Sequence, residues 1–157
     1  MGIQVVYATM WKNVMNEQEV AQLAQSMGKE CLAVRARLLS RVVTALYDRE
    51  LRPLGLKGNQ CTMLVCVARS GNIDQAGIGR ILKMEKSTVS RGIDRLRAQG
   101  WVESDSPDGH CLRLTAAGRK LLVEVHRRWL CAQQRAADLL GTAGVARLKE
   151  VTGPLFR

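Results

Sequence analysis

Residues 85–99 constrain the fold most strongly, because their pattern is that of one amphipathic helix with two unlike faces. At 100° per residue, Val89, Ile93 and Leu96 fall together on a narrow apolar stripe, which predicts packing against a core. The rest of the circumference is polar and suits phosphates and base edges, although solvation alone gives many exposed helices the same residue types. Its polar side chains are Lys86, Ser87, Thr88, Ser90, Arg91, Asp94 and Arg95.

The segment before this helix predicts a helix-turn-helix. Residues 59–69 are expected to form a helix that packs through its apolar side, and a polar turn follows it. Asp74 then caps a short helix that ends at Leu82 and is anchored by Ile78, Ile81 and Leu82. Only three residues separate that short helix from the amphipathic one, so the amphipathic helix takes the place of the reading helix.

The segment after the reading helix predicts a wing. Gly100 ends the helix, and residues 101–104 have the pattern of a strand. A polar turn at residues 105–110 contains Pro, Asp and Gly, which are standard turn residues. Residues 111–114 form the second strand. A hairpin in this position completes a winged helix-turn-helix.

Two further helices have more apolar surface than one small domain can cover. Residues 31–51 are apolar over more than half of the helix circumference, and a helix capped by Thr115 continues to about residue 140, where Gly141 ends it. A last helix follows at residues 142–151. Apolar surface of this kind predicts a homodimer. The expected contacts are Leu32, Leu39, Val43, Leu46, Leu122, Val125, Trp129 and Leu139.

The first 30 residues form an arm with little pattern. Asn16 and Glu19 have the spacing of a capping box, which predicts a short helix through about Met27. The arm is expected to pack on the body or on a partner subunit.

The sequence therefore predicts a mostly α fold, an α+β winged helix-turn-helix with long N- and C-terminal helices that form a dimerisation region. Its expected parts are the arm at 1–30, a dimerisation helix at 31–58, the winged helix-turn-helix DNA-binding region at 59–115, and C-terminal dimerisation helices at 116–157.

The charge of the chain favours a polyanionic partner. The formal net charge is +10 and the pI is about 10.0. The excess is local: residues 80–99 carry six basic and two acidic side chains, whereas residues 100–115 carry one basic and three acidic. Aromatic residues make up 4% of the chain, which argues against a stacking platform for single strands. Double-stranded DNA is the expected partner.

Other classes of function have little support in the sequence. There are two histidines in unrelated contexts, no glycine-rich phosphate loop and no paired carboxylates beside a base, so we expect neither an enzyme nor a cofactor. His110 and Cys111 are adjacent and would point to opposite faces of a strand, so no metal site is expected. With no export signal and no apolar run of membrane-spanning length, the sequence predicts a cytoplasmic protein without membrane contact.

Several short motifs, in this order, resemble the MarR family of winged helix-turn-helix transcriptional regulators. They are Ser87-Thr88-Val89-Ser90-Arg91, Asp94-Arg95-Leu96, Gly100-Trp101-Val102 and Arg113-Leu114-Thr115-Ala116-Ala117-Gly118, within a resemblance that covers roughly residues 31–157. The resemblance implies a homodimeric regulator, usually a repressor, with two reading helices in successive major grooves of a pseudo-palindromic operator. By position, the DNA-facing side chains would be Lys86, Ser87, Thr88, Ser90, Arg91 and Arg95, with Asp94 orienting a neighbouring arginine.

The wing departs from the family pattern. The family has Asp-x-Arg shortly before the Leu-Thr motif, with the arginine in the minor groove, whereas here Asp108 is followed by Gly109 and His110. The loop is also short and acidic. His110 or Arg113 would have to substitute. The acidic wing keeps open a second interpretation, a winged-helix module that binds protein.

The resemblance also implies a release signal, either a small ligand or cysteine oxidation. A ligand cleft would be lined from the first, second and fifth family helices, where Arg35, Arg41 or Arg69 could hold a carboxylate; alternatively these arginines pair with Asp48, Glu50 or Glu124. The five cysteines are scattered and odd in number, which indicates reduced thiols. A redox-sensing regulator would use Cys31, Cys66 or Cys131, although free cysteines are usually small buried hydrophobes.

Overall fold

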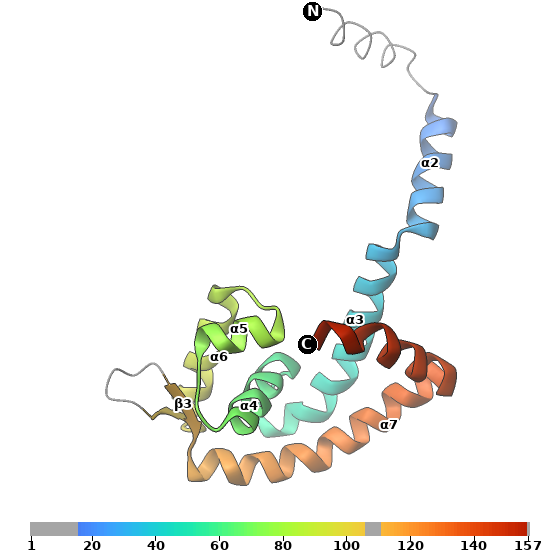
Figure 1. Ribbon diagram of the computed structural model, residues 1–157. Helices are drawn as coiled ribbons and strands as arrows, with labels where there is room; N and C mark the ends of the chain where they lie inside the picture. Colours follow the sequence, from blue (N-terminus) through green and yellow to red (C-terminus); the bar gives the residue numbers. More distant parts are fainter. Residues whose placement is uncertain (1–15, 106–110, 157) are drawn as a thin grey trace, which may run out of the picture. The chain divides into compact units, whose positions relative to one another are not determined.

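The computed structural model describes residues 16–105 and 111–156 (Figure 1). The chain divides into two compact units, with the division after Arg41. Each unit is described separately below. Within the described residues, no helix combines the length and apolar character needed to cross a membrane.

The first unit contains α2 (Glu17–Glu30) and the beginning of α3 (Leu32–Leu51). The predicted capping box is confirmed: the Glu19 N–H donates to Asn16 Oδ1 at 2.9 Å, and the Asn16 N–H donates to Glu19 Oε2 at 2.8 Å. The helix runs three residues beyond the predicted end, to a break at Cys31, whose ψ is 109°. Arg35 Nε donates to the Lys29 carbonyl at 3.0 Å and so satisfies part of the open end of α2.

The second unit holds the remaining elements. They are the rest of α3, η1 (Arg52–Leu54), α4 (Gly58–Ser70), β1 (Ile73–Asp74), α5 (Gln75–Leu82), α6 (Lys86–Ala98), β2 (Val102–Ser104), β3 (Cys111–Leu114), α7 (Ala116–Thr152) and η2 (Gly153–Phe156). The predicted helix-turn-helix is α5 and α6, and the predicted hairpin is β2 and β3. These bounds agree with the predictions to within one or two residues.

The sheet has one strand more than the sequence predicted. Its order is β1-β3-β2, and both pairs are antiparallel, with Ile73 opposite Leu112 and Val102 opposite Leu114. The strand β1 has only two residues, which is too short for a periodic signal. It joins the start of the helix-turn-helix to the wing.

The core of this unit lies between α4, α5, α6 and the sheet. Leu64, Ile78, Ile93, Leu96 and Leu112 are each 0% exposed. Ile81 was predicted to anchor α5 but is 47% exposed. The prediction was wrong because the buried side of this eight-residue helix is already formed by Gly77 and Ile78.

The long helix α7 breaks where the sequence predicted. Gly141 has φ 66° and ψ 166°, which are non-helical values, inside an otherwise continuous hydrogen-bonded run. Before this break, α7 contacts the end of α3. Arg135 Nη1 lies 2.8 Å from Glu50 Oε1, and the Glu50 side chain is only 10% exposed. The Tyr47 hydroxyl donates to Gln133 Oε1 at 2.5 Å. These two polar contacts fix the end of α3 on the middle of α7.

One predicted dimer contact belongs to the interior of the subunit. Val125 is 2% exposed and packs in the core that α4 and the sheet share with α7. It therefore contributes to the stability of a single chain and is not available to a partner. The prediction was wrong because periodicity marks a buried face without saying which neighbour buries it.

Candidate nucleic-acid interface

The helix α6 is held by the apolar stripe that its sequence predicts. Val89 is 1% exposed, and Ile93 and Leu96 are 0% exposed. The helix packs on α4 and α5 (Figure 1). Before it, Lys83 ends α5 in the left-handed conformation with φ 53°, and Glu85 is the N-cap residue of α6. The polar side of α6 therefore faces away from the core.

The polar side of α6 is accessible. Lys86, Ser87, Arg91 and Arg95 are exposed, and Thr88 and Ser90 are half-buried. None of these three cations forms an ion pair within residues 16–105 and 111–156. Asp94 is also exposed, and in the same residues it makes no ion pair with an arginine, so the expected orienting contact is not found. Four of the six predicted DNA-facing residues thus have exposed side chains.

The register of α6 on α4 depends on a glycine that the sequence did not single out. A Cβ on Gly92 would overlap the Sδ and Cε atoms of Met63, which is 1% exposed. The two helices can approach closely here because residue 92 has no side chain. This contact therefore fixes the position of Arg91 and Arg95 relative to α4.

The wing residues predicted to contact DNA have a different outcome. Arg113 Nε lies 2.9 Å from Glu103 Oε1, and Arg113 Nη1 lies 2.7 Å from Asp105 Oδ1. The antiparallel register explains the first pair, because Glu103 is directly opposite Arg113. The guanidinium is thus engaged by two carboxylates of the same hairpin. His110 lies outside the described residues, and minor-groove contact by either residue stays a prediction.

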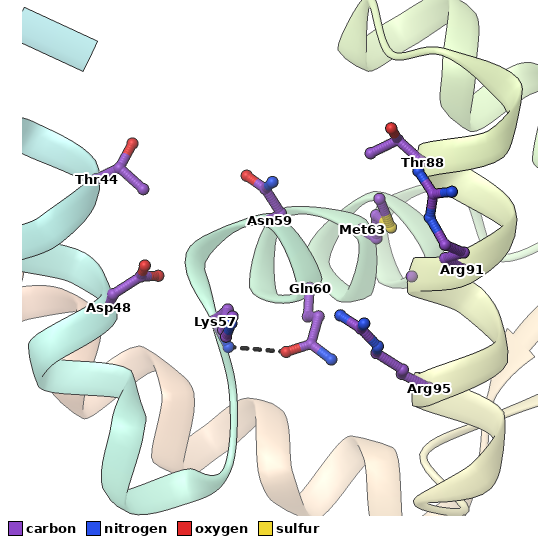
Figure 2. A pocket seen from close by; sticks show the side chains of 10 residues that line it. Thr44, Asp48, Lys57, Asn59, Gln60, Met63, Thr88, Arg91 and Arg95 are labelled. Carbon is purple, nitrogen blue, oxygen red and sulfur yellow. Dashed lines mark hydrogen bonds between the residues drawn. The ribbon is translucent and has the colours of Figure 1, made fainter. Parts of the chain in front are cut away.

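A pocket of about 260 Å³ lies between α3, the start of α4 and one edge of the polar side of α6 (Figure 2). Arg91 and Arg95 line it from α6, with Arg95 extending toward Gln60, and Asp48 lines it from α3. The Asp48 carboxylate accepts a hydrogen bond from the Gly58 N–H at 2.5 Å, which places it at the start of α4. The complete lining is Thr44, Asp48, Lys57, Asn59, Gln60, Met63, Thr88, Arg91, Gly92 and Arg95.

A second pocket, of about 370 Å³, is more apolar and lies between α3, α4 and α7. Tyr47, Cys61, Val65 and Trp129 are among its lining residues. Its helices are those from which the predicted ligand cleft was to be built.

The cations of the first pocket are Lys57, Arg91 and Arg95, which are not the arginines that the sequence predicted. Arg35 donates to the Lys29 carbonyl, and Arg69 lies near Cys66, where its charge partly opposes the rise in the thiol pKa that burial causes. The carboxylates proposed as alternative partners have other contacts: Glu50 pairs with Arg135, and Glu124 pairs with Arg127.

The thiols differ in burial, and this bears on the redox interpretation. Cys61 is 7% exposed, and burial raises its pKa to about 11. Burial also raises the pKa of Cys66, although Arg69 acts in the other direction. A sensing thiol needs an exposed thiolate, so Cys66 is poorly suited. Cys31 is partly exposed and Cys131 is exposed. Among the described residues, no group of three His, Cys, Asp or Glu side chains could hold a metal ion.

The burial of Cys61 predicts a loss of stability in alkali. Its pKa is raised from the ordinary 9.0 to about 11, so the unfolded chain releases the proton first as the pH rises. The free energy of unfolding should therefore be unaffected below pH 9 and should fall between pH 9 and about 11, by up to about 2 kcal/mol. Urea unfolding of wild type and Cys61→Ala at several pH values measures the difference, which should shrink over this range. A constant difference would contradict it.

Two residues at the start of α7 connect the reading helix to the wing. The Thr115 hydroxyl donates to the Gly100 carbonyl at 2.6 Å and accepts from the Gly118 N–H at 3.0 Å, which confirms the predicted cap. A Cβ on Gly118 would overlap the Trp101 carbonyl oxygen. The sequence signal for both was the Leu-Thr-Ala-Ala-Gly run, whose glycine had no assigned role.

Comparisons of sequence agree with this arrangement. The sequence model of the MarR family matches residues 54–110. An uncharacterized HTH-type transcriptional regulator of Bacillus subtilis, YwoH, is 34% identical over 64 residues, which are 41% of this chain and 47% of that protein. The multiple antibiotic resistance protein MarR of Salmonella typhimurium is 25% identical over 87 residues, 53% of this chain and 60% of that protein. The chain thus spans about half to three fifths of the length of these relatives.

Solved structures share the fold over most of the chain. A mutant of MarR from E. coli, complexed with operator DNA, matches with a TM-score of 0.72 at 20% identity and covers 83% of this chain and 98% of its own. A MarR-family transcriptional regulator from Rhodococcus matches with a TM-score of 0.66 at 22% identity and covers 81% and 97%. Over residues 54–110 the chain is thus similar in sequence to the MarR family, and its fold is the winged helix-turn-helix that these solved structures share.

Proposed function

We propose that the chain is a sequence-specific regulator of transcription that binds double-stranded DNA as a homodimer, with α6 in the major groove. The observation that carries this proposal is the division of α6 into a buried stripe and an exposed cationic face. Lys86, Arg91 and Arg95 are exposed on that face and form no ion pair among the described residues, so their charge is available to a partner.

The chemistry of this face matches a duplex. A helix fits the major groove, and Arg forms bidentate hydrogen bonds with guanine there. Lys86 and Ser87 lie on the first turn of α6, where free backbone N–H groups favour phosphate. The relatives support this use, since two are named as regulators and one solved structure contains operator DNA.

The proposed partner at the second half-site is another copy of the chain. Leu32 is 79% exposed, Leu139 is 55% exposed and Trp129 is 38% exposed, which is unfavourable for apolar side chains in water. The half-buried Leu39, Val43, Leu46 and Leu122 extend the same set. We propose that these residues form the dimer interface of a cytoplasmic repressor, which brings two copies of α6 to one operator.

The salt dependence of binding tests the proposal. Selection of genomic fragments by the purified chain gives an operator, and its affinity is then measured at increasing salt. A reader with several phosphate contacts loses affinity steeply, with a log-log slope of about −0.9 per phosphate. A protein-interaction module would select no fragment, or would bind all fragments with equal affinity.

We also propose a small anionic effector in the pocket between α3, α4 and α6. Arg91 and Arg95 border both this pocket and the DNA-facing side, so an anion that draws them inward would compete with DNA. Lys57 adds a third cation, and Met63 gives an apolar floor. A small aromatic carboxylate has the matching chemistry.

Benzoate is a suitable probe for this pocket. Millimolar benzoate is expected to weaken operator binding several-fold, because its carboxylate pairs with Arg91 or Arg95. The Lys57→Ala variant should lose most of this response while retaining operator affinity. Fluorescence anisotropy of labelled operator measures both quantities. An equal response to benzoate in wild type and variant would contradict the placement of the ligand.

A further inference from the structure

The helix α2 has an apolar face that no other described residue of its own unit covers. Val20 is 53% exposed, Leu23 is 52% exposed and Met27 is 71% exposed, and no residue of α2 is buried. These side chains, with Ala24, recur at helical spacing on one side. A helix of 14 residues is only marginally stable in water without packing, so a covered face would account for its formation.

The occupant is indicated by the pattern of the whole segment at residues 17–41. Val20, Ala24, Met27, Cys31, Val34 and Leu38 follow one another at alternating spacings of four and three residues, as in a two-helix seam. These six positions are also symmetric about Lys29. An antiparallel copy of the same segment would therefore place Val20 opposite Leu38, Ala24 opposite Val34, and Met27 opposite Cys31.

The charges of the segment have the same symmetry. Residues 17–30 contain three acidic side chains and one basic, whereas residues 32–41 contain three arginines and no acid. Glu17 and Arg41 lie at equal distances from Lys29 along the chain, so the antiparallel arrangement brings them together at both ends. The acidic α2 is unsuited to DNA or to an anionic membrane surface. A second copy supplies the basic helix that it lacks.

The break at Cys31 is compatible with this pairing. In a two-fold arrangement centred on Lys29, the bend of each copy lies beside the bend of the other. Each α2 then meets a straight part of the other copy's α3, and the two contacts are equivalent by symmetry.

We propose that residues 17–41 form an antiparallel clasp with the same residues of a second copy, in addition to the interface proposed above. This inference rests on the proposed homodimer only in that both require two copies. It concerns a segment that lies before the matched family segment, so the two can fail separately.

Cross-linking in the full-length chain tests the register. The pair Ala24→Cys with Val34→Cys should form a disulfide-linked dimer within minutes of mild oxidation, because these positions face each other between copies. The control is Gln25→Cys with Val34→Cys, which turns one thiol about 100° away from the seam. Non-reducing electrophoresis reads the result. Cross-linking of the first variant no faster than that of the control would overturn the clasp.

A charge exchange tests the chemistry. Glu17→Arg and Arg41→Glu should each raise the dimer dissociation constant by about 10-fold, since two ion pairs become repulsive in each dimer. The double variant should return to within about threefold of wild type. Sedimentation measures this, with operator binding at saturating protein as an independent assay. Unchanged dissociation constants in both single variants would show that α2 has another occupant; a dimer and operator binding that persist there would leave the regulator proposal intact.

Discussion

Arg91→Ala is expected to weaken binding to a selected operator by at least 10-fold. Arg91 lies near the middle of the exposed side of α6, and loss of a base contact costs on the order of 1 to 3 kcal/mol at each half-site. The discrimination against a mutated operator should fall as well, because the variant loses a contact that reads sequence. Titration of labelled operator and of a scrambled duplex by anisotropy measures both effects.

A matched control separates base reading from net charge. Arg128→Ala removes the same charge from α7, where Arg128 is exposed and lies outside the proposed interface. It should change specific binding by less than about twofold once salt is near physiological, since distant charges are then largely screened. If both variants lose affinity equally, the reading face lies elsewhere than on α6. Ser87→Ala adds a milder test on the same face, with a smaller loss.

Gly118→Ala should be the most destabilising single-methyl substitution in the chain. The new Cβ would overlap the backbone carbonyl of Trp101, and a backbone atom cannot rotate away as a side chain can. The start of α7 must then shift, and the Thr115 contact to the Gly100 carbonyl shifts with it. Overpacking of this kind costs about 3 kcal/mol. Urea unfolding followed by circular dichroism measures the loss.

The control for this variant is Gly153→Ala. Gly153 has φ −50° and ψ −49°, and nothing lies within 4 Å of an added Cβ, so alanine should be neutral there. Equal stability of Gly118→Ala and wild type would mean that the start of α7 and the Trp101 carbonyl do not approach as described. Because the contact connects the end of α6 to the wing, Gly118→Ala should also weaken operator binding at temperatures where the chain remains folded.

The elements of the winged helix-turn-helix were predictable because their signals are local. Val89, Ile93 and Leu96 define the buried stripe of α6 by period alone, and Asp74 and Thr115 mark helix starts through their own side chains. The same periodicity misassigned Val125 and Ile81, since it reports burial without naming the neighbour. The strand β1 was missed because two residues are too short to show a period.

The candidate site, too, was predicted only in part from the sequence. The sequence identified the exposed cations of α6, but it did not predict that Arg91 and Arg95 line a pocket. Ligand binding by Arg35, Arg41 or Arg69 stays a prediction. Which cations share a pocket depends on where α3, α4 and α6 meet, and these segments are distant in the chain. Likewise, the engagement of Arg113 by Glu103 and Asp105 follows from strand register and from the path of the hairpin.

The sequence by itself determined the helices of the second unit, the two strands of the wing and the apolar stripe of α6, because hydrophobic period, caps and turn residues act over a few positions. It also determined the charge of the reading helix. Only the tertiary structure decided that Gly92 and Gly118 are close-approach positions, that Cys61 is a buried thiol, and that the exposed Arg91 and Arg95 also line a pocket. Those properties depend on distances between segments far apart in the chain, and no local pattern encodes such distances.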